Sequence, residues 1–207
     1  MTLRLNGSSS GFTEIDAPAA AGSNTLTMPT SNGSANQYLA NGSTAGELTF
    51  VTPPGSFTSY AIICDQKAHD ANGGTFTSGA FRTRDLNTEL ADPDSIVSIS
   101  SNQFTLGAGN YLIEASAPVY RVDRHITRLQ NITDSETVTW GTAEYADASN
   151  LVANRSFLVA RVSLTGSTTF ELQHRADTTN STQGFGVSSS FTGTNSIYAI
   201  VKIYKEA

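Results

Sequence analysis

The chain has 207 residues, of which 38% are hydrophobic and 14% are charged, and its formal net charge is −6. This charge argues against nucleic acid or an anionic membrane as the main partner, because both repel an acidic protein. The single cysteine, Cys64, excludes an intramolecular disulfide and a cysteine-based metal site. We find no signal-peptide core and no run of membrane-spanning length, so we expect a protein made in a cytoplasm without membrane insertion.

Residues 1–55 carry large apolar residues only singly, separated by Asn-Gly, Gly-Ser and Ala-Gly steps. Asn-Gly between extended segments is a strong hairpin signal, and it occurs at Asn32-Gly33 and at Asn41-Gly42. Strands this sparse bury too little surface to offset the ordering entropy of a lone chain. The segment is therefore either a disordered tail or a β-stalk in which several chains share one thin core. The regular spacing of the apolar residues favours the stalk.

A second domain, residues 56–207, follows Pro53-Pro54-Gly55, which stiffens the chain and then lets it turn. In this domain short alternating segments are joined by turn-rich connections, and the fold class is all-β with no convincing helical period. One segment, 143–153, is equally compatible with a helical turn and with a surface loop. The sequence predicts a jelly-roll β-sandwich with strands near 60–66, 81–86, 96–99, 103–106, 111–119, 126–132, 137–140, 158–164, 170–174 and 197–204.

The last predicted strand is apolar on both faces. By the period of two, one face consists of Ile197, Ala199, Val201 and Ile203. The other face consists of Tyr198, Ile200, Lys202 and Tyr204. One face belongs in the sandwich core, and a second apolar face needs a further partner. We therefore expect Tyr198, Ile200 and Tyr204 to form an interface with other copies of the chain.

Motifs for catalysis are missing from the sequence. Its three histidines, His69, His125 and His174, lack the spacing of metal ligands, and there is no nucleophile elbow and no P-loop. The sequence therefore predicts no enzyme, no cofactor and no metal site. Asp92-Pro93-Asp94 has oxygens that suit calcium, but a plain turn is the simpler interpretation.

Aromatic residues in or beside loops are candidates for contact with a receptor. Trp140, Tyr145 and Phe185 can each stack on a sugar ring, although core packing is the commoner role of such side chains. A charged cluster lies close by in the sequence, formed by Arg121, Asp123, Arg124 and Arg128. Three roles remain open for this cluster: an ion-pair set between subunits, a contact with an anionic sugar, or a solvated strand edge.

The second domain resembles the trimeric jelly roll of the C1q and tumour-necrosis-factor type. The matching pieces include the opening Tyr60-Ala61-Ile62-Ile63-Cys64 and the strand Tyr111-Leu112-Ile113-Glu114-Ala115 after its glycine-rich turn. Further pieces are 155–157, 162–164, 170–173 and 200–204. The resemblance implies a homotrimer.

The N-terminal region has a second resemblance. Residues 11–29, with Ala17-Pro18-Ala19-Ala20-Ala21-Gly22, are similar to the N-terminal segment of bacteriophage appendage proteins, particularly of phages that infect cyanobacteria. Residues 30–51 are similar to a segment that precedes the distal head of phage tail fibres, with Tyr38 where those proteins carry an aliphatic residue. Together the resemblances imply a trimeric virion protein, made in the host cytoplasm.

The implied function is attachment. A fibre or appendage protein of this kind would hold another virion protein, of the tail, baseplate or capsid, through residues 1–55. Its jelly-roll head would bind a host-surface glycan or protein. The alternative is a trimeric capsid decoration protein that clamps the shell through residues 1–55. A small polysaccharide hydrolase is a third hypothesis, which is disfavoured because phage depolymerases resemble long β-helices and this chain has no such repeat.

Overall fold

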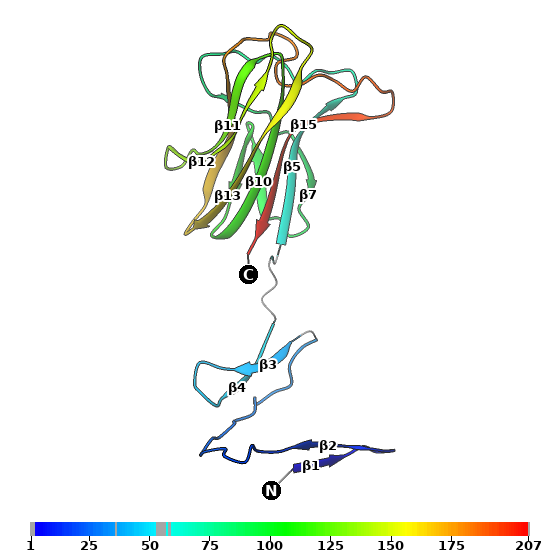
Figure 1. Ribbon diagram of the computed structural model, residues 1–207, viewed down its shortest axis with the longest axis vertical. Coiled ribbons are helices and arrows are strands. Elements are labelled where there is room, and N and C mark those ends of the chain that lie inside the picture. The colour runs from blue at the N-terminus through cyan, green and yellow to red at the C-terminus, as the bar shows by residue number, and fades with distance from the viewer. Residues whose placement is uncertain (1–2, 36, 53–56, 58, 207) are drawn as a thin grey trace. The chain divides into compact units, whose positions relative to one another are not determined.

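The computed structural model describes residues 3–35, 37–52, 57 and 59–206, and every helix or strand assigned within them is a β-strand (Figure 1). The chain divides into two compact units, Met1–Pro54 and Gly55–Ala207. Within the described residues no helix is long and apolar enough to cross a membrane.

The N-terminal unit contains two antiparallel hairpins. The first pairs β1 (Leu3–Asn6) with β2 (Phe12–Ile15), and the second pairs β3 (Tyr38–Asn41) with β4 (Leu48–Val51). The predicted turn at Asn41-Gly42 follows β3 directly, and the Gly42 amide donates to the Glu47 carbonyl. Neither hairpin has a hydrophobic core of its own among the described residues, because none of the strand residues of either is buried.

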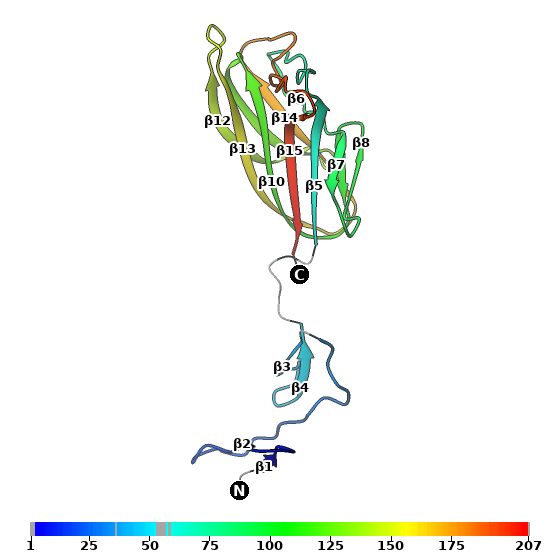
Figure 2. The same cartoon turned by 90° about the vertical axis from the view of Figure 1, so that its right-hand side faces the viewer.

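The second unit, which we call the head, is a sandwich of two sheets that form separate layers (Figure 2). The five-stranded sheet has the order β13 (Ala153–Leu164), β10 (Gly109–Tyr120), β15 (Asn195–Lys205), β5 (Ser59–Ala68), β7 (Thr88–Ala91). The six-stranded sheet has the order β12 (Glu136–Ala146), β11 (Asp123–Asn131), β14 (Thr168–Ala176), β9 (Gln103–Leu106), β8 (Val97–Ser100), and the short β6 (Arg82–Thr83) pairs with β14.

Sheet neighbours come from distant parts of the sequence, as in a jelly roll. The last strand, β15, lies between β10 and β5 in the middle of its sheet. This arrangement confirms the predicted all-β jelly-roll sandwich.

Four elements differ from the sequence prediction. Strand β13 begins at Ala153, five residues before its predicted start at 158. The strand predicted at 137–140 continues to Ala146, so most of the ambiguous segment 143–153 is strand followed by a turn rather than a helical turn. The strand predicted at 81–86 pairs only over Arg82–Thr83. The edge strand β7, Thr-Glu-Leu-Ala, was not predicted, because an edge strand needs little apolar content to pair.

The main core lies between the two sheets. Alternate residues of β10 and β15, such as Ile113 and Val201, pack there with Phe104, Leu172 and Phe170. The Phe104 and Phe170 rings stack with centroids 5.5 Å apart. A smaller cluster fills one end of the sandwich and consists of Phe76, Val119, Val122, Ala146, Ala176 and Phe185.

A buried histidine pair links the two sheets. His125 Nε2 lies 2.7 Å from Asn154 Oδ1 of the other sheet, and His125 Nδ1 lies 3.0 Å from His174 Nε2. Because the Asn154 oxygen only accepts, His125 Nε2 donates to it, and His125 Nδ1 accepts from His174 Nε2. His174 Nδ1 then carries a lone pair, and it has no hydrogen-bond partner among the described residues.

Both imidazoles are held neutral by their surroundings. Burial lowers the pKa of His125 and lowers that of His174 well below its ordinary value. The buried Arg84 guanidinium lowers both pKa values further, while Glu144 opposes this effect at His125. Arg84 itself is fully buried, and this desolvation lowers its pKa to about 9.

We expect the free energy of unfolding to decrease as the pH falls below about 6.5, the ordinary pKa of histidine. In this range the unfolded chain binds protons that the folded chain does not, so acid removes stability. Each histidine contributes up to about 1.4 kcal/mol per pH unit until its folded pKa is reached. Urea unfolding between about pH 7.5 and pH 5.5 measures the slope.

Two variants show whether the pH dependence of the unfolding free energy comes from the buried histidine pair. The variant His69→Gln, at a half-buried turn residue outside the pair, should keep it, and the double variant His125→Gln, His174→Gln should flatten it. A double variant that folds and keeps the wild-type slope would contradict the assignment.

Candidate functional site

A shallow pocket of about 900 Å³ opens on the outward face of the six-stranded sheet. We call it the aromatic groove, because three aromatic side chains border it. Strands β11, β12 and β14 supply most of its lining, together with Phe81 beside β6. The lining residues are Phe81, Arg124, His125, Ile126, Trp140, Ala143, Glu144, Tyr145, Arg175, Ala176 and Asp177.

A β-bulge brings Trp140 and Tyr145 to the same face of β12. These residues are five apart, and in a regular strand they would point to opposite faces. The register between β11 and β12 shifts so that Gly141 and Thr142 together oppose one residue, Thr127. Trp140 then pairs with Arg128 and Tyr145 with Arg124 on the outward face.

Close packing at the bulge requires glycine. An added Cβ at Gly141 would lie 2.1 Å from Thr127 Oγ1 and 2.8 Å from Ser156 Oγ. The Ser156 hydroxyl donates to the Thr142 carbonyl at 2.7 Å and lies 2.8 Å from Thr127 Oγ1. The bulge is therefore also a contact between the two sheets.

One end of the groove is fixed by the Arg128 guanidinium. Its Cζ lies 4.0 Å from the Phe81 ring centroid and 5.9 Å from that of Trp140. The Phe81 and Trp140 centroids are 5.6 Å apart. Arg128 Nε donates to Gln173 Oε1 at 2.8 Å, and Arg128 Nη1 donates to Thr137 Oγ1 at 3.0 Å. These bonds hold the aromatic pair in place, while Trp140 stays 54% exposed.

The other end of the groove is centred on Tyr145, which is 53% exposed. Arg124 Cζ lies 5.9 Å from the Tyr145 ring centroid, and Arg124 Nη1 lies 3.6 Å from Asp177 Oδ2. The negative charge of Asp123, more than that of Asp147, raises the pKa of the Tyr145 phenol. At this end the charges of Asp123 and Asp147 thus act against that of Arg124.

The structure separates the three aromatic residues that the sequence singled out. Trp140 and Tyr145 border the same groove, but Phe185 is 7% exposed and lies in the smaller core cluster. The Arg84 guanidinium stacks on the Phe185 ring at 3.9 Å and donates to its carbonyl at 2.8 Å. Phe185 thus packs against a buried cation and offers no surface to a receptor.

Phe81 and Arg175 are among the groove residues that were not singled out from the sequence. Phe81 lies about 60 residues before Trp140, and Arg175 lies within β14, which alternates like any half-buried strand. Only the pairing of β6 and β11 with β14 brings them to the same surface. No local pattern marks them.

The five-stranded sheet has an outward face with apolar residues in every row. One row across the strands reads Tyr60, Tyr204, Leu112, Arg161. The next reads Ile62, Lys202, Glu114, Val159. In a third row Ile200 and Ser116 are followed by Phe157. Val159 is 60% exposed and Phe157 is 53% exposed. We call the apolar members of these rows the outer apolar face.

The three residues predicted at a subunit interface occupy two environments. Ile200 and Tyr204 lie on the outer apolar face and are partly buried. Tyr198 is only 2% exposed, and its hydroxyl donates to the Ala71 carbonyl at 2.6 Å. A register shift between Ile197 and Ile200 interrupts the alternation, so Tyr198 turns under a loop of its own chain.

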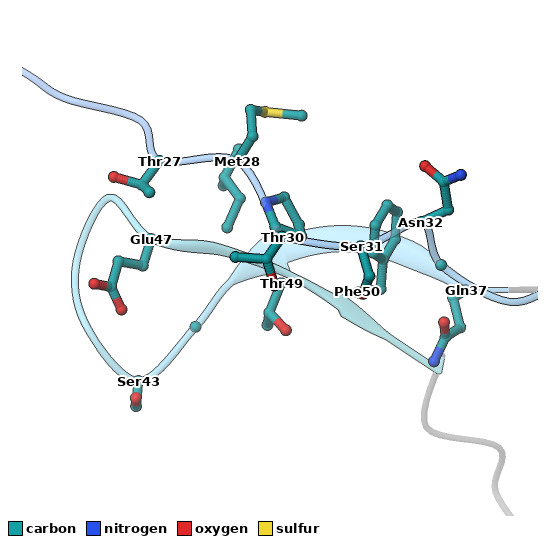
Figure 3. A pocket seen from close by; sticks show the side chains of 14 residues that line it. Thr27, Met28, Thr30, Ser31, Asn32, Gln37, Ser43, Glu47, Thr49 and Phe50 are labelled. Atoms are coloured by element: carbon teal, nitrogen blue, oxygen red, sulfur yellow. The ribbon is translucent and has the colours of Figure 1, made fainter.

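The N-terminal unit has a pocket of about 670 Å³, shown in Figure 3. It forms where the chain at Thr27 pairs with Glu47, and the Leu48 amide donates to the Thr27 carbonyl. Its lining consists of hydroxyl, amide and apolar groups with one carboxylate, Glu47. No cluster of charged groups converges in this lining, so we interpret the pocket as a space beside two paired backbone segments and not as a reactive site.

The Asp92-Pro93-Asp94 segment forms a turn. Asp92 accepts hydrogen bonds from the backbone amides of Ile96 and Val97 at 2.9 Å each, and Asp94 accepts one from the Ser59 hydroxyl. Among the described residues, no group of three or more His, Cys, Asp or Glu side chains could hold a metal ion.

No protein-family model and no curated protein matches this chain. Among solved structures it is similar to the globular domain of zebrafish complement 1qA, with 13% identity and a TM-score of 0.47 over 72% of this chain and 97% of that chain. It is also similar to murine APRIL, with 8% identity and a TM-score of 0.48 over 71% of this chain and 98% of that chain. The PRD1 vertex protein P5 has 15% identity and a TM-score of 0.45, over 74% of this chain and 100% of that chain. At these low identities and TM-scores, the similarities indicate a fold and do not indicate a function.

We expect Gly141→Ala to disturb the aromatic groove. Its methyl group has no room beside Thr127 Oγ1, and overpacking of this kind costs about 1–3 kcal/mol. The melting temperature should fall, and the fluorescence of Trp140, the chain's single tryptophan, should shift. Gly166→Ala is the matched control, because a Cβ there meets nothing within 4 Å. Equal behaviour of the two variants would show that the bulge does not depend on glycine.

Proposed function

We propose that this chain is a homotrimeric virion protein that attaches the particle to a surface. Residues 1–55 would bind another virion protein, and the head would contact a host-surface glycan or protein. The observation that carries the proposal is that each unit has a surface with exposed large apolar side chains.

The outer apolar face of the head is the first of these surfaces. Its apolar residues alternate with groups that are already paired, such as Lys202 with Glu114 at 3.5 Å and Arg161 with Glu206 at 2.6 Å. Because the charges in the middle of this face are paired, the face can be buried against the same face, or against its edge, in another copy of the chain. We propose three copies because residues 60–204 resemble trimeric jelly rolls.

The N-terminal unit is the second surface. Leu5, Phe12, Ile15, Leu26 and Met28 are each more than half exposed. Hairpins with this exposure gain stability by packing against other chains, because an isolated two-stranded hairpin is marginally stable in water. This supports a shared stalk, and residues 11–51 resemble segments of phage appendages.

The aromatic groove supports the attachment role of the head. It lies on the outward face of the six-stranded sheet, whereas the outer apolar face belongs to the five-stranded sheet. The two surfaces are on opposite sides of the sandwich, so assembly through one leaves the other accessible. Trp140 and Tyr145 are the receptor-contact residues in this proposal.

The alternative function, a capsid decoration protein, uses the same trimer but needs no receptor. Labelled antibodies on virions separate the two: label at the tail or at a fibre supports attachment, and label spread over the capsid shell supports decoration. Purified protein should also reduce adsorption of virions to the host if the head binds the receptor. Full adsorption in the presence of excess protein would contradict the attachment role.

We expect Val159→Glu to disrupt assembly without unfolding the head. The wild-type protein should scatter light with about three times the chain mass of 21.8 kDa. A carboxylate at a 60% exposed strand position costs the isolated head little, but it would be buried without a partner in the assembly.

Leu151→Glu is the matched control, because Leu151 is 80% exposed and lies in a turn outside the rows of the outer apolar face. It should remain trimeric. A wild-type protein of one chain mass, or a trimeric Val159→Glu variant, would overturn the proposed interface.

A further inference from the structure

We propose that the aromatic groove binds an uncharged saccharide. One pyranose ring lies against Trp140, and the adjoining sugar units are held by hydrogen bonds near Tyr145. This inference rests on the proposed attachment function and names the ligand class of the same site.

The aromatic side chains supply a preorganised surface for a sugar ring. Trp140 and Tyr145 are each more than half exposed, although both are large side chains that usually pack inside. Phe81 and Arg128 pack against Trp140, so little conformational entropy is lost when a ligand binds. The axial C–H groups of a pyranose are a weakly positive apolar patch, which matches the negative face of an aromatic ring.

The polar groups of the groove can both donate and accept hydrogen bonds. Among the described residues, the Arg175 side chain makes no hydrogen bond or ion pair, so its guanidinium is available to a ligand. Arg124 and Asp177 are 3.6 Å apart, too far for a good hydrogen bond, so each keeps unused capacity. Sugar hydroxyls both donate and accept, and they can use arginine donors and an aspartate acceptor together.

The charge balance favours a neutral ligand over an acidic one. Two arginines and two carboxylates line the groove, and the lowered pKa of His125 keeps that side chain neutral. Arg128 adds a positive charge beneath Phe81, but its Nε and Nη1 already donate to protein oxygens. At the other end Asp123 and Asp147 place two further negative charges near Tyr145, and they raise its pKa. A sugar carboxylate would therefore gain little from the arginines.

Weak single sites suffice in the proposed trimer. Three grooves would face outward on the assembly, and multivalent contact with a repeating glycan raises avidity by about 10²–10⁴ over one site. A shallow open groove with millimolar affinity is then adequate for attachment.

Fluorescence of the full-length protein tests the proposal, because Trp140 is the only tryptophan and lies in the groove. The neutral probes are maltotriose, cellotriose, mannotriose and triacetylchitotriose. The acidic probes are trigalacturonic acid and sialyllactose. We expect a saturable change in emission with at least one neutral probe and with neither acidic probe. Saturation by acidic probes alone, or by no probe, overturns the proposal.

Two variants that keep the fluorophore locate the binding. Tyr145→Ala should weaken the neutral sugar about tenfold, which is the effect expected from loss of one aromatic contact. Asp177→Asn should weaken the neutral sugar and make the groove more positive, so that an acidic probe now binds. Asp70→Asn, at an exposed loop aspartate outside the groove lining, is the matched control and should bind like wild type. Unchanged affinity in both groove variants would place the sugar elsewhere and overturn the proposal.

Virion adsorption separates this inference from the proposed function. If the protein binds no saccharide but still blocks adsorption, and Trp140→Ala abolishes the block, the ligand is a protein and only the saccharide inference fails. If the protein binds a neutral saccharide but leaves adsorption unchanged, the saccharide inference stands and the attachment role fails.

Discussion

The head depends on the place of its last strand. Strand β15 lies between β10 and β5, so the five-stranded sheet is complete only when the C-terminal residues have joined it. Its inward side chains, Ala199, Val201 and Ile203, are fully buried in the main core. Its outward side chains Ile200 and Tyr204 are part of the outer apolar face. One strand therefore couples the fold of the head to the surface through which we propose that it assembles.

The two outward faces of the sandwich differ in chemistry. The five-stranded sheet presents apolar rows whose charges are paired within the chain. The six-stranded sheet presents aromatic rings beside arginine and aspartate side chains with spare hydrogen-bonding capacity. The first composition suits burial against another protein surface, and the second suits a hydrated ligand that both stacks and forms hydrogen bonds. A sandwich can keep both because its sheets face away from each other.

Much of the fold followed from periodicity in the sequence. Alternation of apolar and polar residues located most of the long strands, including β10, β13 and β14, although β13 begins at Ala153, five residues before its predicted start. Alternation failed where a bulge interrupts it. At Tyr198 the register shift of β15 turns the ring under a loop, and at Gly141 the shift of β12 brings Trp140 and Tyr145 together. A bulge adds one residue to one strand only, and the sequence of that strand does not show it.

The sequence by itself determined the all-β class, the turn-rich N-terminal region and the apolar character of both faces of β15, because these follow from side-chain chemistry and spacing along one strand. Only the tertiary structure decided which aromatic residues meet. It enclosed Phe185 against Arg84, and it assembled the aromatic groove from β11, β12, β14 and Phe81. Strand pairing sets these contacts, and it depends on interactions between residues far apart in the chain.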